Sequence, residues 1–476
     1  MARRSSVLQW VTAVGVVVVL TVGITAAISR GADNDVVADV PAQWDPRVLE
    51  LANFVQRERG ALFDHPVPVD FLTPETYSEQ TRTDEGALTE EDRAEIEQFE
   101  GAMRALGIVS GDTDLLEATN DLTDSGTLAF YDSFEERVVV RGTEVTPGLA
   151  VTLVHELTHV LQDQVFSLDR YREEFESEGG QVTSGESYAF DSLVEGDADR
   201  IEAIYLESLD QATRDAIDAE NEVGLEAFED AAIPDALTAL FGSIYGLGDA
   251  FVAVLESIKG ESVDGAFADP PVTEEQVFDP FTYLDEDAPA AVDPPDTDGD
   301  EVFDQGDFGA VSLMVVLAER IDPRQALAAA TGWGGDAYAV FPRDGRTCFR
   351  LNVTGDTDRD TAELADAAVD WVAAFPGSGG RSPSARTSRA GDIVFLESCD
   401  PGSSSVGGTG GSTTAVELAV TRSYVAAGAL EEGADNEQAR CFASALVDGL
   451  TQEELASEDP SPAVERKAAA IAARCR

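Results

Sequence analysis

The stretch at residues 151–164 places the strongest constraint on what this chain can fold into, because it holds the sequence His-Glu-Leu-Thr-His at positions 155–159. Residues four apart on an α-helix lie on one face, one turn apart, so a helix here presents both imidazoles to one metal ion. Two histidines at this spacing, with a glutamate after the first, are typical of zinc sites in which the glutamate acts on a water molecule. We therefore predict a helix that carries His155 and His159 as zinc ligands and Glu156 as general base.

A chance occurrence of this HExxH pattern is the alternative interpretation, and composition counts against it. The chain has 3 histidines among 476 residues, and two of them fall in the pattern. For that composition the random expectation is on the order of 0.004 matches. The apolar side chains of Val154 and Leu157 also indicate burial, where imidazoles without a metal would need other polar partners. Metal binding is therefore the preferred interpretation.

A second acidic pattern follows in residues 187–209, which have helical spacing. Glu195 and Asp199 are four residues apart there, and so lie on one face of the helix. A catalytic zinc takes three protein ligands and keeps one position open, so we predict Glu195 as the third ligand. Asp199 is then the carboxylate that accepts the other N–H of a ligand histidine. Solvated acids on an acid-rich surface are the alternative, and Glu202 and Asp197 are the next candidates for the third ligand.

The HExxH pattern and the later Glu-Gly-Asp-Ala-Asp at 195–199 together resemble the gluzincin metallopeptidases, the zincins whose third ligand is a glutamate from a following helix. The chain looks most like poorly characterised, membrane-anchored bacterial and archaeal members of that group, over about Asp45 to Phe341. Weaker similarities to them lie in four further stretches: 65–69, 131–142, 270–277 and 332–336. The resemblance implies one Zn²⁺ per chain, held by the three predicted ligands, in an endopeptidase that acts on polypeptides.

The chain departs from the better-known gluzincins in two respects. Glu195 lies far beyond His159 in the sequence, and His65 is the only further histidine that could stabilise a transition state. A lone histidine before a proline is more often structural, so a tyrosine would have to take that role. We prefer Tyr245 over Tyr188. The resemblance implies no particular substrate.

A second class of function stays open at this point. The chain could be a non-catalytic cell-envelope protein that keeps zinc for folding or for binding a partner. A structural zinc is closed by four protein ligands, whereas this sequence offers three ligands and a general base. The enzyme is therefore the preferred interpretation.

The charge of the chain excludes one large class of partner. The formal net charge is −61, and only 31 residues are lysine or arginine, of which Lys259 and Lys467 are the lysines. Nucleic-acid binding is not expected, because the phosphates would be repelled. The acids are spread along the chain, which suits a protein that works in high salt, although an acidic proteome would give the same composition.

The segment Val7–Ile28 runs for 22 residues without a charge. At ~1.5 Å per residue, a helix of this length spans about 33 Å, enough for a hydrocarbon core of about 30 Å. Arg3 and Arg4 precede it and acids follow from Asp33, so the N-terminus should be cytoplasmic and the rest extracytoplasmic. We predict a single-pass membrane anchor. A signal peptide cleaved near Ala27, which would release the protein, is the alternative.

All four cysteines lie in the last third of the chain: Cys348, Cys399, Cys441 and Cys475. None forms a CxxC pair, and an even count outside the cytoplasm predicts two disulfides. Three pairings are open, and proximity in sequence favours Cys348–Cys399 and Cys441–Cys475.

The predicted fold class is α+β. It combines a zincin-like catalytic domain, built from a small mixed sheet with an edge strand and the active-site helices, with an N-terminal transmembrane helix and a mainly helical C-terminal region. Residues 127–131 and 137–141 are predicted to form a hairpin, and its second strand, just before the motif helix, is the candidate edge for an extended substrate. Thr146-Pro147 should open the motif helix. The Asp-rich stretch 296–307 imitates a calcium loop but has Glu301 where such a loop needs glycine, so we interpret it as solvated and leave calcium open.

The expected divisions of the chain are a cytoplasmic tip, the anchor, a linker, a metallopeptidase domain, an α/β extension, a Gly/Ser/Thr-rich linker and a helical C-terminal region, at 1–6, 7–28, 29–44, 45–345, 346–402, 403–414 and 415–476. Residues 269–280 are expected to form an ordered loop.

Overall fold

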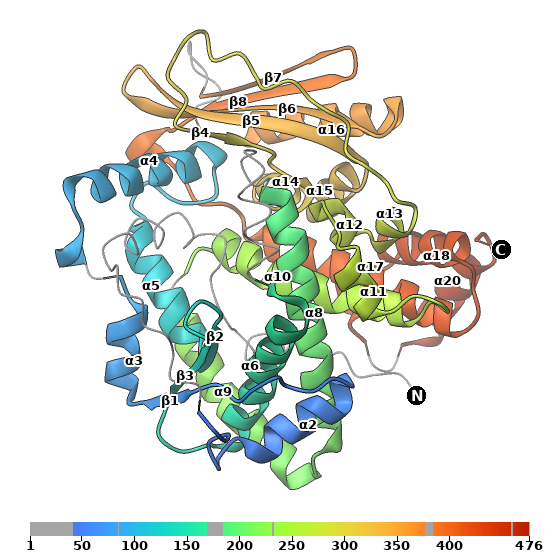
Figure 1. The fold of residues 1–476 in the computed structure, drawn as a ribbon. Helices are drawn as coiled ribbons and strands as arrows, with labels where there is room; N and C mark the ends of the chain where they lie inside the picture. Colours follow the sequence, from blue (N-terminus) through green and yellow to red (C-terminus); the bar gives the residue numbers. More distant parts are fainter. Residues whose placement is uncertain are drawn as a thin grey trace. The chain divides into compact units, whose positions relative to one another are not determined.

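The computed structural model describes residues 41–83, 85–168, 184–230, 233–376, 384–457 and 460–475, so the predicted anchor at 7–28 lies outside the described residues (Figure 1). The chain divides into two compact units, and each is mixed α and β. Unit 1 takes its described residues from Met1–Glu97, Asp114–Gly180 and Asp197–Ile233, and unit 2 takes its own from Gln98–Thr113, Gln181–Gly196 and Pro234–Arg476. Helix α8 (Ser184–Ser208) passes from unit 2 into unit 1 after Gly196.

Unit 1 surrounds a small mixed sheet with helices. Its strands among the described residues are β1 (Val69–Leu72), β2 (Ala129–Asp132) and β3 (Arg137–Arg141). They lie in the order β1-β3-β2, with β1 parallel and β2 antiparallel to β3. Its helical elements include α2 (Leu49–Arg59), α3 (Pro74–Thr81), η3 (Glu85–Ala87), the start of α4 (Glu90–Leu106), α5 (Leu115–Gly126), α6 (Pro147–Phe166) and α9 (Gln211–Asp230). The small mixed sheet and the 127–141 hairpin are thereby confirmed, although β3 is central and the sheet ends at β2.

Helix α6 carries the HExxH pattern, and its ends follow from local sequence. Thr146 is the N-cap, with its side chain accepting from the N–H of Leu149, and Pro147 occupies the first turn as predicted. Glu220 of α9 also fixes this end of the helix, because one of its carboxylate oxygens accepts hydrogen bonds from the N–H of Gly148 and from the Thr146 hydroxyl. The register of the histidines is therefore fixed from the start of the helix.

The core of unit 1 is built around α6. Leu153 and Leu157 of that helix are fully buried in one apolar cluster with Phe54 of α2 and with Val138 and Val140 of β3. Each buried side chain of this size contributes on the order of 1.5–3 kcal/mol to folding. The two histidines are thus carried by the most buried helix of the unit's core cluster.

Unit 2 contains an antiparallel sheet with strand order β4-β5-β6-β8-β7 among the described residues. These strands are β4 (Asp304–Gly306), β5 (Trp333–Arg343), β6 (Arg346–Gly355), β7 (Ala385–Ala390) and β8 (Ile393–Cys399). Helix α16 (Asp358–Ala374) packs against β6, β7 and β8. The predicted division at 345/346 falls in the turn of the β5–β6 hairpin, so it would separate two paired strands.

A helical layer forms the rest of unit 2. Its members among the described residues are α10 (Asp235–Glu256), α11 (Val263–Ala268), α12 (Glu274–Phe278), α13 (Pro280–Leu284), α14 (Ala310–Ala318), α15 (Pro323–Thr331), α17 (Gly411–Glu431), α18 (Asn436–Gly449), α19 (Gln452–Leu455) and α20 (Pro462–Ala472). Helix α10 packs along α17 and contacts α14. The predicted loop at 269–280 instead holds α12 and the start of α13, because Thr273 and Asp279 cap these two short helices.

Both favoured disulfides are confirmed. Cys348 and Cys399 lie opposite each other on β6 and β8 and are bonded across the sheet. Cys441 of α18 is bonded to Cys475, which follows α20. The first bond ties neighbouring strands, and the second ties the C-terminal helices together.

Two predicted loops are more ordered than composition indicated. The stretch at 403–414 is not a free linker, because residues 411–414 begin α17 and the Glu319 carboxylate accepts from the N–H groups of Gly410 and Ser412. The Asp-rich stretch 296–307 is tied to the sheet, since Arg343 pairs with its Asp298 and Asp300. Arginines thus balance carboxylates in the stretch that imitates a calcium loop.

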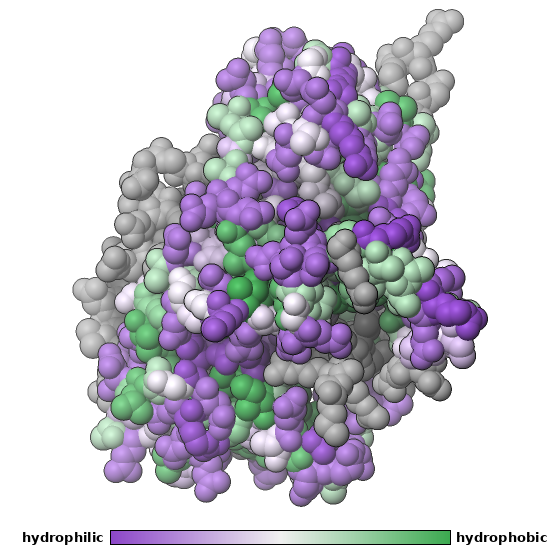
Figure 2. Space-filling view, turned by 90° about the vertical axis from the view of Figure 1, so that its right-hand side faces the viewer, coloured by the Kyte–Doolittle hydropathy of each residue, from purple (hydrophilic) through white to green (hydrophobic). Residues whose placement is uncertain are grey.

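One helix of the described residues, α10, is long and apolar enough to cross a membrane. However, 72% of its most apolar stretch is buried inside the protein, as in the core helix of a globular protein. The molecular face in Figure 2 is mainly hydrophilic with scattered apolar residues, in keeping with the net charge of −61.

Candidate metal centre

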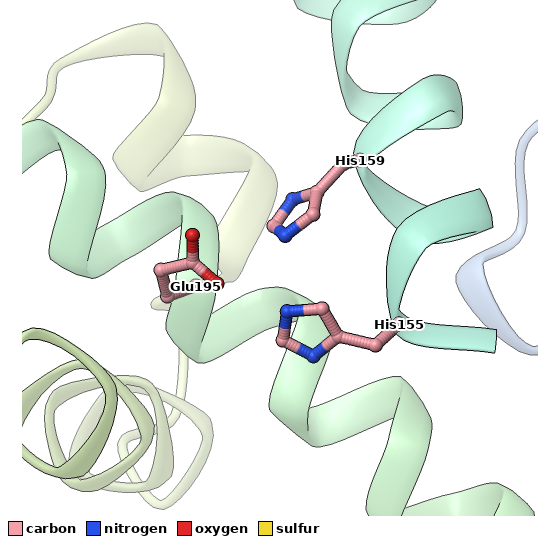
Figure 3. Close-up of side chains that lie close together, drawn as sticks. All are labelled: His155, His159 and Glu195. Atoms are coloured by element: carbon pink, nitrogen blue, oxygen red, sulfur yellow. The ribbon is translucent and has the colours of Figure 1, made fainter. Parts of the chain in front are cut away.

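The two histidines of α6 lie side by side with their rings turned to the same space. His155 is 2% exposed and His159 is 9% exposed. Their ring centroids are 4.6 Å apart, with the ring planes at 83° to each other. Figure 3 shows one nitrogen of each ring turned toward the space that Glu195 also faces. The four-residue spacing therefore has the consequence expected from the sequence.

Glu195 is the third member of this group. His155, His159 and Glu195 each offer one ligand atom, and these atoms all lie within 4.8 Å of one another (Figure 3). Glu195 is carried by α8, the helix that also holds Asp199 one turn further on. The structure thus brings together the three residues that the sequence predicted as ligands.

A glycine contact sets the path of α8 next to Glu195. A Cβ atom at Gly196 would lie 2.2 Å from the carbonyl oxygen of Gly248 in α10, and a Cβ at Gly248 would lie 2.1 Å from that of Ser192. No side chain can be accommodated at such distances, so the two helix backbones touch here. Tyr188 adds a polar contact between the same helices, since its hydroxyl donates to Ser243 Oγ at 2.8 Å. Helix α10 therefore supports the turn of α8 that presents Glu195.

The second nitrogen of His155 faces two carboxylates. His155 Nδ1 lies 3.2 Å from an oxygen of Asp199 and 3.5 Å from an oxygen of Glu202. A proton on Nδ1 satisfies these carboxylates and leaves Nε2 as the metal-binding atom. Asp199 thus lies where the sequence predicted it. Glu202 was expected only as a substitute ligand, and its position beside Asp199 follows from the three-residue spacing on α8.

His159 is held differently, by a residue that the sequence prediction missed. Its Nδ1 lies 2.9 Å from Gln162 Oε1, so the ring can donate to the amide and direct Nε2 to the metal position. Gln162 Nε2 in turn donates to Asp197 at 3.0 Å. Arg59 and Arg200 donate to the same buried carboxylate, which excludes Asp197 as a ligand in this arrangement. The i,i+3 spacing of His159 and Gln162 was the signal that could have revealed this contact.

The donor set fits a zinc ion. Two imidazole nitrogens and one carboxylate oxygen are the ligand types that catalytic zinc sites use, and both rings have their other nitrogen engaged. His155, through Nδ1, also lies close enough to Asp199 and Glu202 for the three to bind one metal ion. We prefer the group with Glu195, because it uses both histidines and leaves those two carboxylates to fix the His155 ring.

Glu156 lies next to the first histidine and is 2% exposed. Its Oε2 accepts a hydrogen bond from the backbone N–H of Tyr131 in β2 at 2.8 Å. The Tyr131 hydroxyl is directed elsewhere, donating to Asp163 at 2.8 Å. The ring of Tyr77 is also buried nearby, and burial followed by the charge of Glu156 raises the pKa of its hydroxyl. The predicted base is thus oriented by the strand at the end of the sheet.

The remaining predicted residues lie outside the ligand group. Tyr245 is buried on α10, with its ring beside Phe241, and its role in stabilising a transition state stays a prediction. Burial raises the pKa of Tyr188, whose hydroxyl is bonded to Ser243. His65 is partly exposed, with Nε2 3.8 Å from a carboxylate oxygen of Glu136, which suits the structural role that was preferred for it.

A surface cavity of about 600 Å³ in unit 1 contains none of these residues. It is lined by α3, α5 and the segment between them, with Arg82 at its wall. That arginine already pairs with Asp121 and Asp124. We assign no chemistry to this cavity.

Comparison with known proteins gives a family match for one part of the chain. Residues 300–416 match the model of a family described as a domain of unknown function (DUF8575). The matched residues include the whole five-stranded sheet of unit 2 and none of the three predicted zinc ligands. No curated protein and no solved structure matches the chain. Any functional conclusion must therefore come from the geometry of the site.

Proposed function

We propose that this protein is a zinc-dependent endopeptidase, anchored in the membrane by residues 7–28, with its active site outside the cytoplasm. The observation that carries the proposal is that His155, His159 and Glu195 lie close enough to bind one metal ion, with the buried Glu156 next to His155 on the same helix. Three protein ligands leave one coordination position for water or substrate, as in catalytic rather than structural zinc sites.

The chemistry divides between the ion and the protein. When bound, Zn²⁺ polarises a carbonyl oxygen and lowers the pKa of a water molecule. The carboxylate of Glu156 takes a proton from the attacking water and later delivers it to the leaving amine nitrogen. The N–H of Tyr131 holds Oε2 of this carboxylate in place for both transfers. The neighbours of the imidazole Nδ1 atoms, Gln162 and Asp199, keep the two rings in one orientation.

The sheet offers a way to hold an extended substrate. Strand β2 ends the three-stranded sheet, and its Phe130 pairs with Val139 while the N–H of Arg141 donates to Leu128. In an antiparallel ladder the residues between such pairs direct their backbone groups away from the neighbouring strand. Tyr131 is one of these, and its N–H meets Glu156. A peptide that adds to β2 would therefore run past the general base, and this strand replaces β3 as the proposed substrate edge.

The decisive experiment compares zinc content with peptide cleavage in the full chain. Glu156→Gln keeps the shape of the side chain and removes the base. It should retain zinc and the fold, yet reduce cleavage of a peptide library by at least ~10²–10⁴-fold, as expected for loss of general acid–base catalysis. His155→Ala and Glu195→Ala should instead lose zinc, and His65→Ala is the matched control that should keep it.

Two results would contradict the proposal. A fully zinc-loaded wild-type protein that cleaves no peptide would leave a zinc-binding envelope protein as the better conclusion. So would a Glu156→Gln variant that cleaves as fast as wild type.

A further inference from the structure

Three carboxylates in unit 2 form another group of possible metal ligands. Glu275 in α12, Asp287 after α13 and Asp356 between β6 and α16 each place one carboxylate oxygen within 4.8 Å of the others. Glu275 and Asp287 are 12 residues apart and Asp356 lies a further 69 residues along the chain, so the fold brings the third carboxylate to the other two. The group contains only oxygen donors.

One carboxylate oxygen of the buried member has no hydrogen-bond partner. Glu275 is 5% exposed, and its Oε1 atom is buried without a hydrogen bond. A buried carboxylate in that condition is costly unless a proton or a cation compensates it. Burial, and then the charges of Asp356, Asp279 and Asp287, raise the pKa of Glu275 to about 9. Arg440 and Arg422 act on this carboxylate through their charges, but neither donates a hydrogen bond to its Oε1 atom.

The backbone at the two exposed members is fixed. The N–H of Asp287 donates to the carbonyl of Thr282 at 2.9 Å, and its own carbonyl accepts from Gln276 Nε2 at 2.8 Å. The N–H of Asp356 donates to the carbonyl of Gly332 at 3.1 Å. Backbone hydrogen bonds therefore fix the positions in the chain that carry both carboxylates.

A nearby arginine does not neutralise the group. Arg440 lowers the pKa of both Glu275 and Asp356, but burial and the neighbouring carboxylates outweigh it. Its guanidinium is bonded to Asp279 at 2.9 Å and lies 3.9 Å from Asp285. The Asp-rich stretch 296–307 differs, because arginines bind its carboxylates directly.

We propose that Glu275, Asp287 and Asp356 bind one Ca²⁺ ion. Calcium takes oxygen ligands at about 2.3–2.6 Å, so two oxygens on one ion lie at most about 5 Å apart, as these three do. The absence of histidine and cysteine from the group disfavours zinc. Water completes the coordination from the exposed side of Asp287 and Asp356. The ion fastens α12 and the segment after α13 to the start of α16, independently of the zinc-ligand group.

The test is calcium titration of the full chain by calorimetry at constant salt. Wild-type protein should bind one Ca²⁺ with a Kd of about 10⁻⁴–10⁻³ M, the range of extracellular modules. Asp287→Asn and Asp356→Asn should each weaken binding by at least about 10-fold, because each removes a charged ligand. Asp298→Asn, in the arginine-bound stretch, is the matched control and should bind like wild type. Calcium should also raise the thermal unfolding midpoint of wild type and not of the two ligand variants.

Three outcomes would overturn the proposal. They are the absence of calcium binding at millimolar concentration, ligand variants that bind as tightly as wild type, and magnesium binding as tightly as calcium. Circular dichroism shows whether each variant is folded, and the exposed positions of Asp287 and Asp356 favour folded variants. A zinc-free His155→Ala protein should still bind calcium. The calcium proposal can therefore be tested even if the zinc peptidase proposal fails.

Discussion

At the residue scale, the two histidines of α6 are held by groups of different charge. His155 Nδ1 faces carboxylates from Asp199 and Glu202, which increase the basicity of the ring as a ligand. His159 Nδ1 faces the neutral amide of Gln162, which orients the ring without adding charge. Gln162 is itself fixed by Asp197, whose charge is balanced by arginines. The structure thus places carboxylates behind one predicted ligand and a neutral amide behind the other.

Gln162→Ala tests this arrangement. The change removes the acceptor for His159 Nδ1, so the ring loses its fixed orientation and zinc affinity should fall by about 10–100-fold. Gln164→Ala is the matched control, because Gln164 lies on the same helix but donates to the carbonyl of His65. Zinc affinity measured by competition with a chelator should be unchanged in the control. Equal zinc affinity in both variants would show that Gln162 does not position the ligand.

At the scale of elements, α8 depends on the close approach of α10. Gly196 and Gly248 let the two backbones touch one residue after the predicted ligand Glu195. A methyl group at Gly248 would collide with the carbonyl of Ser192, which cannot rotate away. Displacement of α8 would move Glu195 as well, so we expect packing and the proposed metal binding to be coupled through this contact.

Gly248→Ala should therefore lower both stability and zinc affinity. We expect a loss of about 1–3 kcal/mol or more in the free energy of unfolding, as for overpacked cores. Gly242→Ala on the same helix is the control, since nothing lies within 4 Å of a Cβ there. That change should be neutral or stabilise by up to about 1 kcal/mol. Denaturant unfolding and zinc titration measure the two effects, and similar behaviour of the two variants would refute the coupling.

The start of α14 shows a second element fixed by distant residues. Glu274 accepts from the N–H groups of Val311 and Ser312, and Asp336 accepts from those of Phe308 and Gly309. These two carboxylates come from stretches 270–277 and 332–336, both noted above for their resemblance to the gluzincin group. The structure gives both stretches a structural role at one helix start.

The same carboxylates predict a pH dependence of stability. Burial outweighs the hydrogen bonds and raises the pKa of Glu274 from 4.5 to about 7 and that of Asp336 from 3.8 to about 6. The folded protein then retains protons that the unfolded chain releases, so this contribution to stability is present in acid and is lost as pH rises toward 7. Glu274→Gln cannot lose a proton and should flatten the decline between about pH 4 and about pH 7.

Thermal unfolding at several pH values checks this, with the exposed Glu261→Gln as control. If Glu274→Gln and wild type had parallel pH profiles, the buried carboxylate would not be the titrating group.

The sequence allowed α6, its cap and its ligands to be predicted because those signals are local. The cap at Thr146, the apolar stripe and the four-residue histidine spacing all belong to one helix. Gln162 and Glu202 obey the same helical spacing and could have been found by extending it. The contact of Gly248 with α8 could not, since it depends on how two distant segments pack. The same holds for Glu274 and Asp336, which meet only in the folded chain.

At the scale of the whole molecule, the disulfides and the charge agree with the proposed extracytoplasmic location. Two bonded cysteine pairs suit an oxidising compartment, and both lie after the charge-free segment 7–28. The net charge of −61 keeps such a surface hydrated. One apolar helix of the described part of the chain is long enough to span a bilayer, but it is a core helix of unit 2. The proposed anchor, residues 7–28, lies outside the described residues.

Membrane fractionation of cells that express the full chain tests this topology. The protein should sediment with membranes and be released by detergent rather than by salt, because about 20 apolar residues suffice to span a bilayer. Protease added to intact cells should digest the C-terminal part, and a variant without residues 7–28 should stay inside with its cysteines reduced. Protein found in the medium with a new N-terminus after Ala27 would instead establish a cleaved signal peptide. A C-terminal part protected in intact cells would contradict both alternatives, and with them the extracytoplasmic location of the peptidase.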